Sequence, residues 1–72
     1  MTEQEAKAIV LEWLKRRVRE GWYPDNVLEE LYSRHAPSYI LEAHFYILRA
    51  ETVYELLAEF AEWGLNKEGA KG

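Results

Sequence analysis

The chain has 72 residues, no cysteine and a formal net charge of −4, which predicts one small domain. The absence of cysteine excludes a disulfide scaffold and any thiolate metal site. Hydrophobic residues make up 49% of the chain and include three Trp, five Tyr and two Phe, more apolar bulk than so short a chain buries easily. The acidic start MTEQEAKA and the short apolar runs predict a cytoplasmic protein without a signal peptide or a membrane span.

The first predicted helix covers about residues 3–20. Thr2 and Glu5 form a T-x-x-E capping box at its start, and apolar residues then recur at helical spacing. Gly21 is suited to the left-handed conformation that ends a helix. Arg17 falls on the apolar side of this helix, so its guanidinium is expected to stack on an indole ring or to pair with a carboxylate.

The second predicted helix covers about residues 26–36. Asp25 or Asn26 is expected to cap it, with Asn26 slightly favoured because Glu29 follows it three residues later. Pro37 disfavours helical geometry at Ala36, so the helix is expected to end there.

The third predicted helix, about residues 38–50, is apolar on nearly every side. Only Ser38, Glu42 and Arg49 form a narrow polar stripe. A helix of this kind must be covered on nearly every side, so we expect it at the centre of the fold. Because a short chain has few elements to cover it, a partner is also expected, with a second copy favoured.

The last predicted helix covers about residues 52–63. Thr52 and Glu55 repeat the capping-box pattern, which favours a break after the third helix, but no Gly or Pro enforces one and a continuous helix stays open. Gly64 is expected to end the last helix. The sequence therefore predicts an all-α fold, a compact bundle of three to four helices within residues 1–64, followed by a flexible polar tail over 65–72.

Charged residues form two clusters. The first, called here the acidic ridge, is a row on one face of the last helix, interpreted as a solvated face or as a docking site for a basic partner: Glu51, Glu55, Glu59 and Glu62. The second, the basic end of the first helix, complements the helix dipole and is the alternative contact for nucleic acid: Lys15, Arg16 and Arg19.

Neither histidine suggests a metal site. His35 and His44 are predicted on apolar faces, nine residues apart across a helix junction, without the i,i+4 spacing of helical zinc motifs. We expect them to be core or interface residues, and protonation of a buried imidazole near about pH 6 to loosen an interface. No metal or other cofactor is expected.

Catalysis has little support in the sequence. Ser33 is the one serine or threonine outside a capping position, and it lies two residues from His35. Residues with this spacing do not face each other on a helix, so they are not expected to form a nucleophile–base pair, and the chain is not expected to be an enzyme.

Four aromatic residues are candidates for a partner surface, namely Trp22, Tyr23, Phe45 and Trp63, because aromatic side chains dominate binding energy at interfaces. These observations predict a small non-catalytic regulatory or adaptor module that acts by protein–protein interaction, as a homodimer. One alternative is a nucleic-acid-associated regulator that uses the basic end. The other is a small-ligand binder with a pocket in the bundle interior near His44, Tyr46 and Tyr39.

Overall fold

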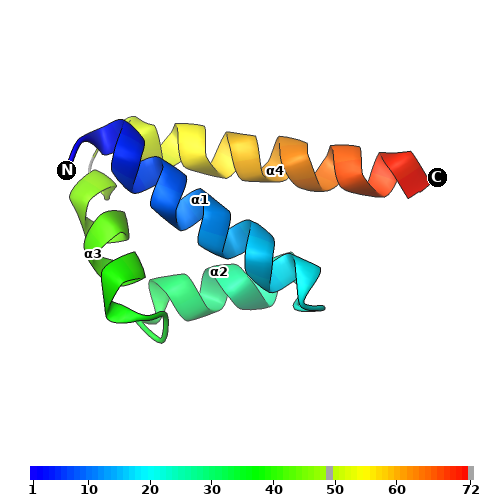
Figure 1. The fold of residues 1–72 in the computed structure, drawn as a ribbon, viewed down its shortest axis with the longest axis horizontal. Coiled ribbons are helices and arrows are strands. Elements are labelled where there is room, and N and C mark those ends of the chain that lie inside the picture. Colours follow the sequence, from blue (N-terminus) through cyan, green and yellow to red (C-terminus); the bar gives the residue numbers. More distant parts are fainter. Residues whose placement is uncertain (49, 72) are drawn as a thin grey trace.

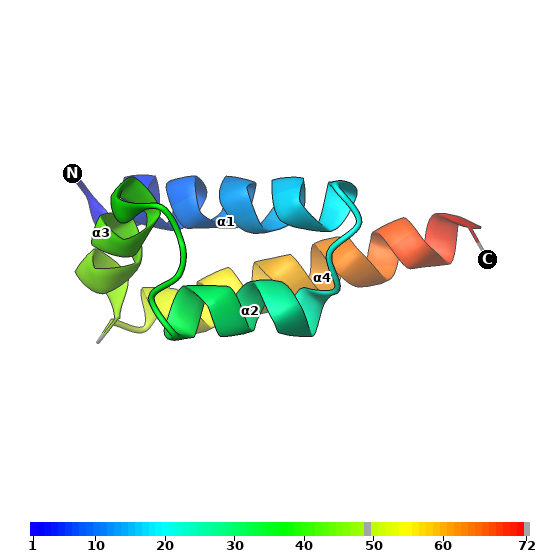
Figure 2. The same ribbon diagram turned by 90° about the horizontal axis from the view of Figure 1, so that it is seen from below.

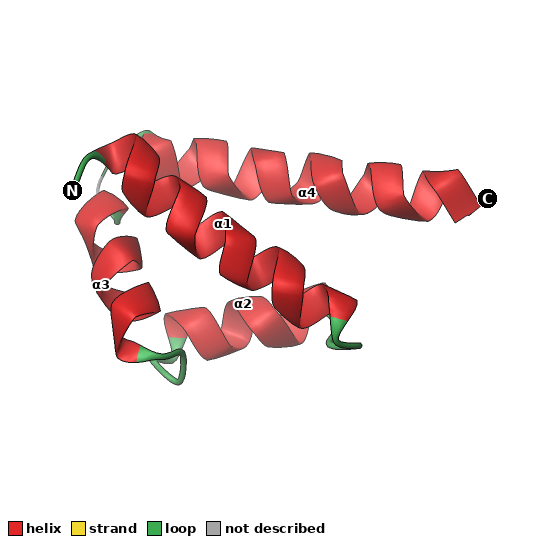
Figure 3. Cartoon of the chain, viewed as in Figure 1, coloured by secondary structure: helices red, strands yellow, loops and turns green. Residues whose placement is uncertain are grey.

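The computed structural model describes residues 1–48 and 50–71, with side chains up to residue 66. This part of the chain contains no strand and forms four helices: α1 (Glu3–Arg19), α2 (Pro24–Tyr32), α3 (Ser38–Ile47) and α4 (Thr52–Lys71). Short loops join them (Figure 3). The predicted all-α bundle is therefore confirmed.

The central helix is α1, so the expectation that the third helix is central is wrong. α1 packs against α2, α3 and α4, whereas those three pack much less against one another. Figure 1 shows α1 running diagonally from the start of α4 towards the start of α2. Figure 2 shows α2 and α4 on the same side of α1, with α3 at one end of the bundle.

The lengths and apolar patterns of the two helices explain this arrangement. α1 has 17 residues and buries side chains towards all three neighbours: Ala6, Val10, Leu11, Trp13 and Leu14. α3 has 10 residues and is buried on one side only, through Ile40, Ala43, His44 and Ile47. The largest side chains that are completely buried come from all four helices: Val10, Leu14, Val27, Leu31, Ile40, Ile47 and Leu56.

The start of α1 is capped as predicted. The Glu5 backbone N–H donates to the Thr2 hydroxyl at 3.1 Å, and the Thr2 backbone N–H donates to the Glu5 carboxylate at 2.9 Å. These hydrogen bonds stabilise the ionised carboxylate and hold the pKa of Glu5 below its ordinary value.

Both predicted ends of the second helix are wrong. α2 begins at Pro24 with Tyr23 as its N-cap, because the fixed φ of proline suits the first helical position and its missing N–H removes no helical hydrogen bond. Asn26 lies inside the helix. α2 ends at Tyr32, four residues early, since Arg34 adopts a left-handed conformation with φ of 64°.

The left-handed Arg34 completes a Schellman motif. The His35 N–H donates to the Glu30 carbonyl at 2.8 Å and the Arg34 N–H donates to the Leu31 carbonyl at 3.3 Å. Glycine is the residue that normally occupies this position. An arginine here is a departure that the sequence pattern does not predict.

The break between α3 and α4 is confirmed, although its local chemistry differs from the prediction. α3 ends at Ile47 and α4 begins at Thr52, while Arg49 lies outside the described residues. Thr52 does not form the expected capping box with Glu55. It is buried, and its hydroxyl donates to Glu3 at the start of α1.

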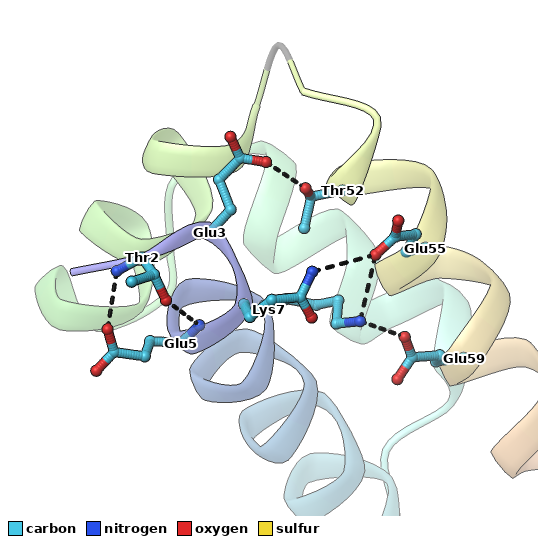
Figure 4. A network of polar contacts seen from close by, with 8 residues as sticks. Thr2, Glu3, Glu5, Lys7, Thr52, Glu55 and Glu59 are labelled. Atoms are coloured by element: carbon cyan, nitrogen blue, oxygen red, sulfur yellow. Dashed lines mark hydrogen bonds and ion pairs between the residues drawn. The ribbon is translucent and has the colours of Figure 1, made fainter.

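Contacts among polar side chains join the starts of α1 and α4 (Figure 4). Lys7 of α1 forms ion pairs with Glu55, at 3.4 Å, and with Glu59. These two carboxylates raise the pKa of Lys7 above its ordinary value. The pairing also offsets the repulsion between two like charges one turn apart on α4.

α4 continues through Gly64 to Lys71, so the predicted helix end at Gly64 is wrong. A glycine inside a helix costs only about 1 kcal/mol relative to alanine, and the residues after Gly64 include leucine, lysine, glutamate and alanine, which favour helix. The predicted flexibility of residues 65–72 stays a prediction, and residue 72 lies outside the described residues.

Alanine substitutions at two glycines test this helix extension. Gly64→Ala is expected to raise the free energy of unfolding by up to about 1 kcal/mol, because Gly64 is helical and an added Cβ meets nothing within 4 Å. The matched control, Gly21→Ala, is expected to lower it by about 1 kcal/mol, since Gly21 has φ of 106°. Urea denaturation measures both. A destabilising Gly64→Ala would contradict the continuous helix.

Candidate protein-binding surface

The four predicted interface aromatics do not form one surface. Trp22 and Tyr23 lie between α1 and α2, Phe45 lies on α3, and Trp63 lies on α4. Tyr23 is 75% exposed and Phe45 is 70% exposed. Trp22 and Trp63 are both engaged within the chain, so Tyr23 and Phe45 are the most accessible of the four.

Trp22 is covered on one ring face by Arg17. The Arg17 guanidinium lies 4.4 Å from the centroid of the Trp22 ring and also pairs with Glu30, with Nη2 at 3.0 Å from Oε1. The expectation that Arg17 stacks on an indole or pairs with a carboxylate is confirmed in both respects. This contact fixes the α1–α2 connection.

Trp63 is partly buried and joins α4 to α1. Its ring stacks on Phe60 with centroids 6.1 Å apart. The Lys15 ammonium and the Arg19 guanidinium lie over the ring, at 5.9 and 5.6 Å from its centroid. Trp63 thus contributes to packing within the chain.

Within the described part of the chain, no ion pair joins the acidic ridge to the basic end. The residue of α1 that binds the ridge is Lys7, which pairs with Glu55 and Glu59, while Glu51 and Glu62 are exposed. Lys7 was missed in the sequence, although a pair of glutamates four residues apart is a signal for a compensating cation.

The basic end is partly occupied by contacts within the chain. Lys15 and Arg19 lie on Trp63, and both Arg16 and Arg19 are exposed. A nucleic-acid surface requires cations presented together towards solvent, and these contacts do not favour that arrangement. The nucleic-acid alternative stays a prediction.

The third helix and its C-cap leave several large apolar side chains exposed. Four large side chains, called here the α3 surface, remain exposed by 41–70%: Tyr39, Phe45, Tyr46 and Leu48. α3 packs on α1 through Ile40, Ala43, His44 and Ile47. At helical spacing, Tyr39 and Tyr46 lie on one flank of this buried side, Leu48 lies on the other flank, and Phe45 lies on the side that faces away from α1. The sequence predicted that this helix needs more cover than the chain provides, and one side of it is indeed uncovered.

Two hollows flank Phe45 on this surface. One, called here the α2–α3 groove, has a volume of about 510 Å³ and is lined by Leu31, Tyr32, Arg34, Leu41, Glu42, His44, Phe45 and Leu48. The other has a volume of about 550 Å³ and is lined by Phe45, Tyr46, Leu48 and Ala50. Phe45 therefore stands between two depressions, a shape that suits insertion into a partner.

The wall of the α2–α3 groove contains the buried His44. Its ring packs edge-on against Tyr32, with centroids 5.0 Å apart. His44 is 6% exposed, and its Nε2 has no hydrogen-bond partner among the described residues. Burial lowers the pKa of His44 below its ordinary value because the charged imidazolium loses its hydration.

The predicted ligand pocket in the bundle interior has a different geometry. Only His44 lies inside, while Tyr39 and Tyr46 are 55% and 53% exposed. These three side chains therefore do not converge on an interior site.

His35 and Ser33 were both misplaced by the sequence. His35 is exposed, because α2 ends before it. Its Nδ1 lies 2.9 Å from the Ser33 hydroxyl, whereas helical spacing predicted no contact. The Ser33 hydroxyl also donates to the Glu29 carbonyl at 2.6 Å, so its proton is already engaged by the backbone of α2.

A second apolar groove, of about 420 Å³, opens between α2 and α4. Its lining comes from three helices: Val18, Pro24, Leu28, Leu57, Phe60, Ala61, Trp63, Gly64 and Leu65. None of these described lining residues is charged, whereas Arg34 and Glu42 line the α2–α3 groove.

The described residues hold no group of three or more histidine, aspartate or glutamate side chains arranged to bind a metal ion. Among the same residues, no helix combines the length and the apolar character needed to cross a bilayer. Comparisons with protein-family models, with curated proteins and with solved structures find no match to this chain.

Proposed function

We propose that this chain is a small non-catalytic regulatory or adaptor module that acts by binding protein, and that it associates with a second copy through the α3 surface. The observation that carries the proposal is Phe45, which is 70% exposed between two hollows on the outer side of α3. Monomeric proteins rarely leave several large apolar side chains exposed together.

The composition of the surface supports the proposal. Phe45, Tyr39 and Tyr46 bury much area with few rotatable bonds, which is why aromatic residues dominate binding energy at interfaces. The α2–α3 groove, which Phe45 lines, offers a partly enclosed site for an inserted side chain, and binding hot spots form in enclosed sites that exclude water. By contrast, Trp22 and Trp63 already bind within the chain.

Phe45→Ser is expected to weaken self-association at least about tenfold, because it removes the most exposed ring of the surface. The matched control is Tyr54→Ser, since Tyr54 is 73% exposed but lies on α4. Sedimentation velocity over a micromolar-to-millimolar concentration series measures both variants and the unmodified chain.

Three results of this experiment are informative. Weakening by Phe45→Ser alone supports the proposal. Equal weakening by both variants would locate the contact elsewhere and contradict it. An unmodified chain that stays monomeric throughout the series would refute self-association.

A further inference from the structure

We propose that two copies pair about a two-fold axis, with Phe45 of each copy seated in the α2–α3 groove of the other and Arg34 of each copy paired with Glu42 of the other. This inference rests on the proposed function and specifies the contacts of that same surface. It assigns a role to Arg34 and Glu42, which the sequence did not suggest as partner residues.

The surface carries both halves of a reciprocal contact. Phe45 projects from it, and the groove beside Phe45 is walled by Tyr32, Leu41 and Leu48. A two-fold interface uses the same patch on both subunits, so each patch needs a projecting side chain and a hollow to receive its equivalent. A foreign partner would require only one of these features. Their presence together favours a second copy as the occupant.

The charges at the groove are also self-complementary. Arg34 and Glu42 both line it and both are exposed. Neither forms an ion pair within the described part of the chain, where Lys7 and Arg17 supply the cations of the ion pairs. One cation and one anion on the same patch form two pairs across a two-fold axis, and opposed charges of this kind fix the register of an interface.

The backbone at Arg34 supports a role for this side chain in binding. Its φ of 64° lies in the region where glycine is favoured. A non-glycine residue in this region raises the energy of the fold, because its Cβ crowds the backbone. No hydrogen bond or ion pair of the Arg34 side chain within the described residues offsets that energy.

Charge reversal tests the pairing. In a dimer of the Arg34→Glu variant, both contacts bring two negative charges together, and in a dimer of the Glu42→Arg variant both bring two positive charges together. Each variant alone is therefore expected to dimerise at least about tenfold more weakly than the unmodified chain. Mixing the two variants restores opposite charges at both contacts. The mixture is therefore expected to form a heterodimer with close to the original affinity, which native mass spectrometry resolves from either homodimer.

Two further variants separate binding from folding. Glu62→Arg is the matched control, because Glu62 is exposed on α4, and it is expected to leave association unchanged. Arg34→Gly relieves the left-handed backbone and removes the charge, so it is expected to raise the thermal unfolding midpoint while weakening association. A purely structural role for Arg34 would not move these two quantities in opposite directions.

The results distinguish this inference from the proposed function. Recovery of a heterodimer on mixing supports the reciprocal pairing. Charge-reversal variants that dimerise like the unmodified chain would overturn it, as would a mixture that stays monomeric. If Phe45→Ser still abolished association in that case, the α3 surface would remain the contact and only the pairing would be wrong.

Discussion

Leu14→Ala is expected to lower the free energy of unfolding by about 3–5 kcal/mol, the range seen when a completely buried leucine is truncated and a cavity remains. Leu14 is 0% exposed and lies on α1, the helix that packs against the other three. Leu14 belongs to a core cluster to which all four helices contribute, so the cavity is expected to close only partly. In a domain of this size, such a loss removes much of the total stability.

The matched control is Leu65→Ala, which removes the same atoms from a side chain that is 71% exposed on α4. It is expected to change the unfolding free energy by less than about 0.5 kcal/mol. Chemical denaturation followed by circular dichroism measures both. Similar small effects for the two variants would contradict the central position of α1.

Acidification is expected to destabilise the fold through His44. Burial holds the pKa of His44 below its ordinary value, so below about pH 6.5 the unfolded chain binds a proton that the folded chain does not. The contribution of His44 is fully present above that pH and is lost as the pH falls. The slope is at most about 1.4 kcal/mol per pH unit.

Urea denaturation at several values between about pH 7.5 and pH 5 measures this slope. His44→Leu is expected to flatten it, while the control His35→Gln is expected to keep it because His35 is exposed. Glu5, whose pKa is lowered from 4.5, loses its contribution at more acidic pH and does not interfere. An unchanged slope in His44→Leu would show that another group is responsible.

The helices of the fold were predictable wherever a local signal existed. Thr2 and Glu5 form the predicted capping box. The helical spacing that placed Arg17 among apolar residues also predicted its contact with an indole ring, which is that of Trp22. The break before Thr52 was also favoured correctly, although the Thr52 hydroxyl binds Glu3 rather than its own helix. That partner lies 49 residues away in the sequence, a separation that local patterns do not reveal.

The predictions failed where a residue departs from its usual preference or where packing decides. Arg34 adopts a conformation favoured by glycine, so α2 ends early and His35 becomes exposed. Gly64 remains helical although glycine commonly ends helices. The apolar character of residues 38–50 correctly indicated uncovered surface, but it did not indicate that α1 would take the central position.

The candidate surface was only partly visible in the sequence. Phe45 was one of the four aromatic residues predicted to contact a partner, and it is indeed exposed. Arg34 and Glu42 were not recognised as groove residues. Which residues line the groove depends on where α2 ends and on how α3 packs on α1. A polar residue on a helix looks the same in a sequence whether it faces open solvent or the rim of a groove.

Isotope-filtered nuclear Overhauser spectroscopy on an equimolar mixture of isotope-labelled and unlabelled chain tests the proposed association most directly. The Phe45 ring of one copy is expected to show contacts to Tyr32, Leu41 or Leu48 of the other. Contacts confined to side chains of the groove between α2 and α4, such as Leu57 and Leu65, would contradict association through the α3 surface.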